Sequence, residues 1–231
     1  VTIASGSHSA AHLNTINAAT TGLVTATAAT TITGTAAAIN TLIGNEGDSG
    51  DKVNLDADYD ITVNSGTASV SLANTFAAAT GGTVTAEITE TDAATLATLN
   101  ETTNAYTITV GDTSVTAARL IAIDGATTVN VTATAVTTIS GAAADLNTVL
   151  TAGGITGLGA EAVTVTDSAV TAAVLNTLNG NTTGLVTATG VTAITGTIAQ
   201  INTLVGNEGD SGDKVNLDTD YTATITDTST T

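Results

Sequence analysis

A long internal repeat constrains what this chain can fold into. Forty residues, TTGLVTATAATTITGTAAAINTLIGNEGDSGDKVNLDADY (Thr20–Tyr59), align without a gap with TTGLVTATGVTAITGTIAQINTLVGNEGDSGDKVNLDTDY (Thr182–Tyr221). The string GNEGDSGDKVNLD is identical in the two copies, and the same offset of 162 residues also aligns Val1 with Val163. Because a repeated sequence meets the same packing problem in each copy, we expect stacked, similar units rather than one irregular core.

A shorter period divides this 162-residue repeat. Related segments recur about every 52–57 residues, and each opens on Val or Tyr in a β-branched stretch. The predicted units are 1–52, 53–105, 106–162, 163–214 (a copy of 1–52) and a partial unit, 215–231.

Each unit divides into two half-units, which we define as a strand, a turn and a short helix. The first type is represented by VTVTDSAVTAAVLNTLNG (Val163–Gly180) and the second by LVTATGVTAITGTIAQINTLVGN (Leu185–Asn207). Alternation of β-branched residues, as in Val163–Thr166, is typical of a half-buried strand. Val129–Leu150 is a further copy of the second type, and Val84–Glu101 and Tyr106–Gly125 are looser copies of the same pattern.

The helical part of a half-unit is clearest at 198–205. Ile198, Ile201, Leu204 and Val205 recur at helical spacing, and Thr197 precedes them as the predicted N-cap. We expect Gly206 to end the helix. A helix of about two turns is not stable alone, so packing against the strands has to hold it.

Strand, turn and short helix in repetition predict an α/β, β-rich fold. We expect an elongated solenoid with parallel strands and short helices, in which neighbouring units bury each other's apolar faces. The chain begins and ends within the repeat pattern, so we expect an open sheet edge at each end. Open sheet edges pair with further strands. The expected partners are therefore copies of the chain, or flanking repeats of the same chain, joined end to end.

Composition narrows the functional classes. The formal net charge is −18, with three basic residues, Lys52, Arg119 and Lys214. This charge disfavours nucleic acid and anionic membranes as partners, whereas 42% hydrophobic residues argue against an acidic disordered chain. No apolar run is long enough for a membrane-spanning helix, so no membrane insertion is expected, and the lack of Cys excludes thiolate chemistry.

The repeated acidic string suggests a calcium site. Ca²⁺ takes six to eight oxygen ligands, commonly from carboxylates on a loop bent by glycine. The alternative is a solvated acidic loop, because the string matches no EF-hand spacing. The candidate ligands are Glu46, Asp48, Asp51, Asp56 and Asp58 in the first copy and Glu208, Asp210, Asp213, Asp218 and Asp220 in the second.

Other candidate sites are sparse. His8 and His12 are four residues apart, a spacing that can bind a metal on a helix, but Val170 and Val174 replace them in the second copy. No nucleophile constellation or phosphate-binding motif is visible, so we expect no enzymatic activity and, besides Ca²⁺, no cofactor.

The segments NTLNGNTTGLVTATGVTAITGTIAQINTL and GAAADLNTVLTAGGITGLGAEAVTVTDSAVTAAVLNTLNG resemble the repeat tracts of very large bacterial surface and secreted proteins. Such tracts occur notably in cyanobacterial proteins that are adhesin-like or S-layer-like. The resemblance covers nearly the whole chain and implies a structural role outside the cell or at its surface. It carries over no catalytic residue.

Two functional classes follow from the sequence. The first is an extracellular structural repeat protein that forms a filament, a surface layer or an adhesin stalk. The second is a solenoid that binds a ligand or a surface, as an adhesin does or as ice-binding proteins do through Thr-x-Thr ladders. The triplet Thr-Ala-Thr recurs at 25–27, 132–134, 187–189 and 222–224, although threonine also simply suits strand surfaces.

Overall fold

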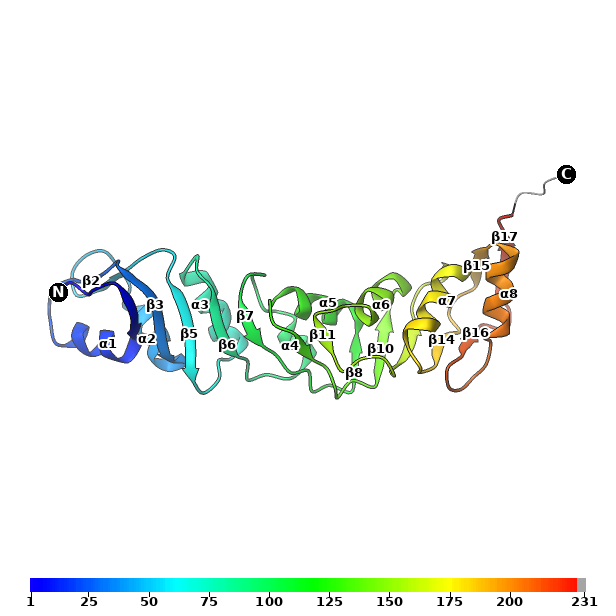
Figure 1. Ribbon diagram of the computed structural model, residues 1–231, viewed down its shortest axis with the longest axis horizontal. Helices are drawn as coiled ribbons and strands as arrows, with labels where there is room; N and C mark the ends of the chain where they lie inside the picture. The colour runs from blue at the N-terminus through cyan, green and yellow to red at the C-terminus, as the bar shows by residue number, and fades with distance from the viewer. Residues whose placement is uncertain (228–231) are drawn as a thin grey trace. The chain divides into compact units, whose positions relative to one another are not determined.

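The computed structural model describes residues 1–227 and confirms an α/β fold built on parallel strands (Figure 1). The chain divides into two compact units. Unit 1 comprises Val1–Thr109 and Ile123–Val131, and unit 2 comprises Val110–Ala122 and the chain from Thr132 onward. The first copy of the forty-residue repeat lies in unit 1 and the second copy in unit 2.

Unit 1 contains a five-stranded parallel sheet in the order β1-β3-β5-β6-β7 and a separate parallel pair, β2-β4. Short helices connect successive strands, as parallel pairing requires. The elements are β1 (Gly6–Ser9), α1 (Ala10–Ala18), β2 (Val24–Ala26), β3 (Ala29–Thr35), α2 (Ala36–Gly44), β4 (Val53–Leu55), β5 (Asp60–Ser65), α3 (Val70–Ala79), β6 (Val84–Glu87), α4 (Ala93–Leu96) and β7 (Ala105–Thr107).

Unit 2 contains a five-stranded sheet in the order β16-β14-β12-β10-β8 and a three-stranded sheet, β13-β15-β17, again with parallel pairs. Its elements include β8 (Ser114–Thr116), β10 (Thr138–Gly141), α6 (Ala143–Leu150), β11 (Ile155–Thr156), β12 (Ala162–Val165), β13 (Ala169–Thr171), α7 (Ala172–Asn181), β14 (Val186–Ala188), β15 (Ala193–Gly196), α8 (Ile198–Gly206), β16 (Val215–Leu217) and β17 (Thr222–Ile225). Two further elements, α5 (Ala117–Gly125) and β9 (Val131–Thr132), have residues assigned to both units.

The core of each unit is a row of aliphatic side chains in register across the strands. In unit 1, Ile32 pairs with Ile61, and Ile61 pairs with Val84; all three are fully buried. In unit 2 the corresponding buried row consists of Val115, Ile139, Val163, Val186 and Val215. Small aliphatic residues stacked in register fill a thin core, which accounts for the scarcity of aromatic side chains.

Hydroxyl side chains form a second row, one position along each strand. In unit 1 the paired positions are Ser9, Thr33, Thr62 and Thr85, and in unit 2 they are Thr116, Ser140, Thr164 and Thr187. None of these eight residues is buried. Because successive side chains of a strand point to opposite faces, the row lies opposite the aliphatic core.

Helix α8 begins as the sequence predicts. Thr197 accepts a hydrogen bond from the Gln200 N–H, and the Gln200 side chain accepts one in return from the Thr197 N–H, which makes a capping box at the start of α8. The predicted end of this helix is one residue early, because Gly206 is its last residue and Asn207 is the C-cap. Leu204 is buried, but Ile198 and Val205 are exposed, contrary to the expected apolar face.

Threonine corners, which we define as the Thr-x-Gly or Thr-x-Val segments that follow a helix, tie neighbouring half-units together. The hydroxyl groups of Thr80, Thr127 and Thr182 donate to the backbone carbonyls of Tyr59, Tyr106 and Glu161, respectively. The same hydroxyl groups accept a hydrogen bond from the N–H two residues later. Each corner therefore fixes its own turn and joins that turn to the preceding half-unit.

Candidate functional site

The two acidic strings fold into the same pair of turns. In the first copy, Asp48 and Asp51 lie exposed in the turn between α2 and β4, which is closed by hydrogen bonds from Gly47 N–H to Val53 C=O (3.1 Å) and from Val53 N–H to Asn45 C=O (3.0 Å). The second copy repeats both bonds at 3.1 and 3.0 Å, from Gly209 to Val215 and from Val215 to Asn207. The turn conformation is therefore a property of the string itself.

The remaining acidic residues of each string lie in the next turn. The Asp56 carboxylate accepts from the Asp58 N–H at 3.2 Å, and Asp218 accepts from the Asp220 N–H at 2.8 Å. These bonds define Asx turns, which need no metal ion. Glu46 and Glu208 form isolated parallel bridges with Val53 and Val215, at the base of the first turn.

Within residues 1–227, no group of three or more acidic or histidine side chains lies close enough together to hold a metal ion. Lys52 lies against the turn of its own acidic string. Its ammonium group donates to the Gly44 carbonyl at 3.4 Å, and its side chain packs beside Gly47, where an added Cβ would lie 3.1 Å from Cγ of Lys52. The string therefore brings its carboxylates onto two adjacent turns, and calcium binding stays a prediction.

Glu46 and Tyr59 are electrostatically coupled beneath this turn. Burial raises the pKa of Tyr59, and the nearby Glu46 carboxylate raises it further. Burial also raises the pKa of Glu46, and its interaction with the Tyr59 hydroxyl partly opposes that rise. Within residues 1–227, the buried Tyr59 hydroxyl makes no hydrogen bond of good geometry, so its interaction with Glu46 is mainly electrostatic.

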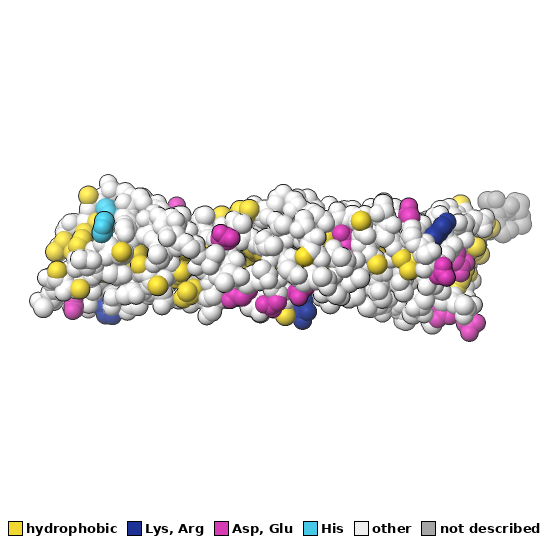
Figure 2. Space-filling view, turned by 90° about the horizontal axis from the view of Figure 1, so that it is seen from below, with side chains coloured by type: hydrophobic (Ala, Val, Ile, Leu, Met, Phe, Trp, Pro, Cys, Tyr) yellow, Lys and Arg dark blue, Asp and Glu magenta, His cyan; other side chains and the backbone are white. Residues whose placement is uncertain are grey.

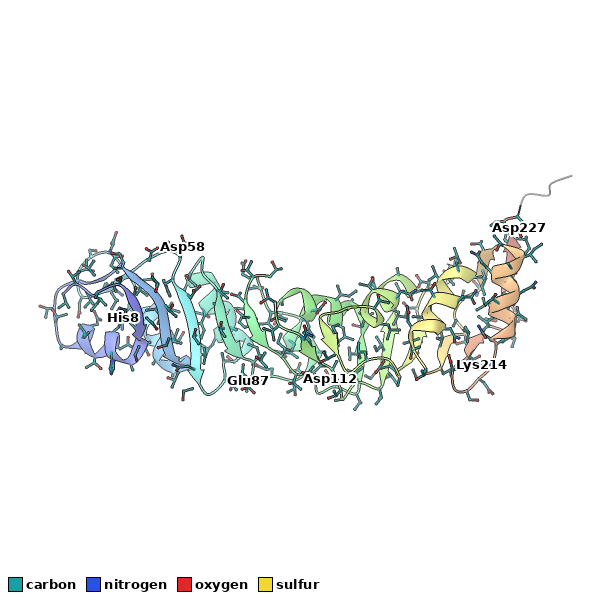
Figure 3. All side chains as sticks on the ribbon, in the orientation of Figure 1. His8, Asp58, Glu87, Asp112, Lys214 and Asp227 are labelled. Atoms are coloured by element: carbon teal, nitrogen blue, oxygen red, sulfur yellow. The ribbon has the colours of Figure 1, made fainter. Side chains whose placement is uncertain are left out.

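A surface hollow of about 430 Å³ lies beside the second acidic turn of unit 1. It is lined by residues 27–30, which connect β2 to β3, and by Asp56, Asp58, Tyr59 and Asp60. Asp58 projects from the chain at this edge in Figure 3. The lining offers three carboxylates, the Tyr59 ring and threonine hydroxyl groups, but neither histidine nor a basic group.

The histidines do not share a helix face as expected. His8 lies in β1, where its Nε2 is 2.8 Å from the Ala4 carbonyl, and His12 lies in α1. The prediction failed because α1 begins only at Ala10, after a short strand. The i, i+4 spacing therefore places the two rings on different elements.

Several acidic residues outside the strings have a structural role that the sequence did not reveal. Glu90, Asp167 and Asp227 accept hydrogen bonds from the first N–H groups of α3, α6 and α8 at 2.9, 2.7 and 2.6 Å, respectively. Figure 3 shows Asp227 beside α8. A carboxylate at a helix N-terminus satisfies a free donor and complements the helix dipole.

The most unusual surface is an apolar face on α8 and β17, which we call the terminal face. Its main side chains are Ile198 and Ile225, which are 54% and 46% exposed. The equivalent residues of the first copy, Ala36 and Val63, are only 9% and 8% exposed. Tyr221 is likewise partly exposed, whereas its equivalent, Tyr59, is buried.

The first copy is covered by the half-unit that follows it. The Gly81 N–H donates to the Ala57 carbonyl at 2.8 Å, and the Ile61 N–H donates to the Thr83 carbonyl at 2.9 Å. Gly82 approaches so closely that an added Cβ would lie 2.5 Å from the Tyr59 carbonyl oxygen. The terminal face is therefore the same surface without its covering half-unit.

The surface charge agrees with the composition. Acidic side chains are scattered over the face that Figure 2 shows, and basic ones are few. Over residues 1–227, no helix is both long and apolar enough to span a bilayer.

Comparisons with family models, with curated proteins and with solved structures give no match for this chain. Two surfaces of the described residues bear on function, the acidic turns and the terminal face.

Proposed function

We propose that the chain is an extracellular structural element whose half-units stack as the coils of a solenoid and continue end to end into a filament, surface layer or adhesin stalk. One observation carries this proposal: closely similar sequences are buried in the first copy and exposed on the terminal face. Exposed apolar side chains beside an edge strand are typical of a surface that another strand covers.

The regular registers support a scaffold as well. Within residues 1–227, the strand pairs of both five-stranded sheets, of β13-β15-β17 and of β2-β4 are parallel. Several half-units share the aliphatic row, the threonine corner and a Thr or Ser side chain that caps the helix. In such a repeat, each half-unit contributes its own stability and its contact with a neighbour, so length can grow without a new core. The high negative charge keeps a long array soluble and separates it laterally from other arrays.

Electron microscopy of cells that make the protein, with antibodies against this chain, tests the proposal. We expect label outside the cell on continuous fibres or layers. Label confined to the cytosol, or on dispersed single molecules, would contradict it.

The hydroxyl rows favour a second candidate, a surface-binding solenoid. Four hydroxyl side chains in register on each five-stranded sheet present a regular polar array, which could bind ice or a polysaccharide surface. The Thr-Ala-Thr triplets contribute only part of these rows, since Thr25 pairs with Asn54. Measurement of thermal hysteresis, with Thr33, Thr62 and Thr85 replaced by Val or Lys as variants, separates this candidate from a passive scaffold.

A further inference from the structure

Four helices carry an asparagine that joins them to a later part of the chain. In each case the side-chain Nδ2 donates to a backbone carbonyl 24–27 residues further on, at 2.9–3.4 Å. The four residues are Asn14 in α1, Asn74 in α3, Asn147 in α6 and Asn176 in α7. Because Nδ2 faces the carbonyl, the orientation of each amide is fixed, and its Oδ1 atom needs a donor of its own.

On α3 and α6 the chain itself supplies that donor. Asn74 Oδ1 accepts a hydrogen bond from the Asn100 N–H at 2.8 Å, and Asn147 Oδ1 accepts one from Asn181 Nδ2 at 3.0 Å. Three residues further along, these two helices carry apolar side chains, Ala77 and Leu150. An apolar side chain at that position needs no hydrogen-bond partner.

On α1 and α7 the corresponding oxygen has no such donor. Within residues 1–227, Oδ1 of Asn14 and Oδ1 of Asn176 are buried and accept no hydrogen bond. The residues three positions further along are again asparagines, Asn17 and Asn179, and their Oδ1 atoms are buried without a partner in the same way. The 162-residue offset relates the two pairs, and Asn17 as a whole is only 7% exposed.

The second asparagine is therefore found where the first one lacks a donor. Residues i and i+3 lie on the same face of a helix, so the two oxygens of each pair are neighbours. A buried polar atom without a hydrogen bond destabilises a fold. Two such atoms on one helix face, repeated in both units, indicate a ligand that bonds to both.

We propose that each pair binds one internal water molecule, which donates one hydrogen bond to each Oδ1 atom. Internal water molecules typically make about three hydrogen bonds to buried polar groups that have no other partner. In unit 1 the site lies where α1 packs beside α2 (Figure 1), because Asn14 bonds to the Ala38 carbonyl of α2. In unit 2 it lies between α7 and α8, where Asn176 bonds to the Gln200 carbonyl. The inference concerns the packing of adjacent half-units and does not depend on the proposed function.

The surroundings favour water over a metal ion. The helices that form the two sites, α1, α2, α7 and α8, contain no Asp, Glu, Lys or Arg. Ca²⁺ takes six to eight oxygen ligands, commonly including carboxylates, and two neutral amide oxygens fall far short of that number. A water molecule is neutral and has two O–H donors, one for each oxygen of a pair.

A high-resolution crystal structure of the chain tests the proposal directly. We expect one peak of density at each pair, about 2.5–3.0 Å from both Oδ1 atoms. No peak should bridge positions 74 and 77 of α3 or positions 147 and 150 of α6, which serve as controls. The lack of density at both pairs would overturn the proposal, and so would a peak about 2.3–2.6 Å from a full set of oxygen ligands, which is a metal distance.

Replacement of the second asparagine should remove one water molecule and leave the other. Asn179→Leu gives α7 the residue type that α6 has at the equivalent position, Leu150. In a crystal structure of this variant, we expect the density between α7 and α8 to disappear and the density between α1 and α2 to remain. The unchanged copy is thus a control within the same molecule. Density that persists between α7 and α8 in the variant would overturn the shared site.

Thermal denaturation distinguishes a bound water molecule from oxygens that are simply unpaired. If water is bound, Asn179→Leu expels it and leaves Asn176 Oδ1 without a donor, so we expect the melting temperature to fall by about 2–4 °C. If no water is bound, the same variant removes a buried unpaired oxygen, and a melting temperature that stays the same or rises would overturn the proposal. Asn40→Leu, at the exposed asparagine of α2, is the matched control for helix propensity and should not lower the melting temperature.

Discussion

The two copies of the forty-residue repeat have the same order of helices and strands but different exposure. Their inner side chains agree: Ile32 and Ile194 are fully buried, and so are Leu42 and Leu204. Their outer side chains differ, since Ile39 is fully buried whereas Ile201, its equivalent on α8, is partly exposed.

This difference shows that the inner and the outer side chains are buried by different neighbours. The inner row is buried by the half-unit's own strands and by the preceding half-unit, so it is the same in both copies. In the first copy, the half-unit that follows Tyr59 covers the outer side chains. Over Tyr221, residues 1–227 contain no such half-unit. A sequence repeat therefore predicts conformation better than it predicts burial.

The largest effect should come from the outer isoleucines. Ile39→Ala leaves a cavity in a filled core, so we expect a loss of about 2–5 kcal/mol in the free energy of unfolding. Ile201→Ala removes a side chain that is already partly in water, and the loss should be about 1 kcal/mol. Urea denaturation of dilute protein measures both. Equal losses would show that the outer face of α8 is covered in solution.

The corner glycines give the next largest effect. Gly82→Ala forces a methyl group against the Tyr59 carbonyl, and we expect a loss of about 1–3 kcal/mol. At Gly22 an added Cβ would meet only Thr20 Oγ1, at 3.8 Å, so Gly22→Ala should change the free energy of unfolding of the monomer by less than about 0.5 kcal/mol. Thermal denaturation followed by circular dichroism compares the two variants. A large loss at Gly22 in dilute protein would mean that this corner is already packed against another group.

Helix capping differs between the copies in a smaller way. Thr35 accepts from the Ala38 N–H, but Ala38 cannot return a side-chain bond as Gln200 does for Thr197. We expect Thr197→Ala to cost about 1–2 kcal/mol and Thr35→Ala about 0.5–1 kcal/mol. Gln200→Ala should remove most of the difference in capping free energy between the two copies. Chemical denaturation of the three variants measures their free energies of unfolding.

The smallest effect concerns calcium. Because the two strings form the same turns, any response to Ca²⁺ should be shared equally between them. We expect Ca²⁺ at fixed ionic strength to raise the melting temperature slightly. One double variant carries Asp48→Asn and Asp51→Asn, and the other carries Asp210→Asn and Asp213→Asn. Each should reduce the rise in melting temperature by the same amount. An identical melting curve in EGTA and in Ca²⁺ would show that the calcium prediction is wrong.

Most of the successful predictions came from patterns of a few adjacent residues. The alternation at Val163–Thr166 placed β12, and Thr197 placed the start of α8, because both depend on a few adjacent residues. The histidine prediction failed at the boundary between β1 and α1, where short-range spacing fits either element. The threonine corners were missed, although the recurrence of Thr20, Thr80, Thr127 and Thr182 after helices could have indicated them.

The candidate site was harder to predict than the fold. The acidic residues lie on turns, but only the folded chain shows that Asp56 and Asp218 bond their own backbones and that Asp227 caps α8. The terminal face could not be read from composition, since its residues are the same type as those buried in unit 1. Exposure there depends on a tertiary neighbour, which no local pattern encodes.

The small sequence separation of the contacts made by the threonine corners affects the rate of folding. Thr80, Thr127 and Thr182 each bond to a carbonyl only 21 residues earlier in the chain. Contacts of this kind close small loops, so they form rapidly and make folding fast for a β-rich protein. A ribosome that has released one half-unit has already released nearly all the residues that half-unit needs. Local opening should start where side chains are least buried, so amide hydrogens of β17, whose residues are all exposed, should exchange with solvent sooner than those of β5 or β12.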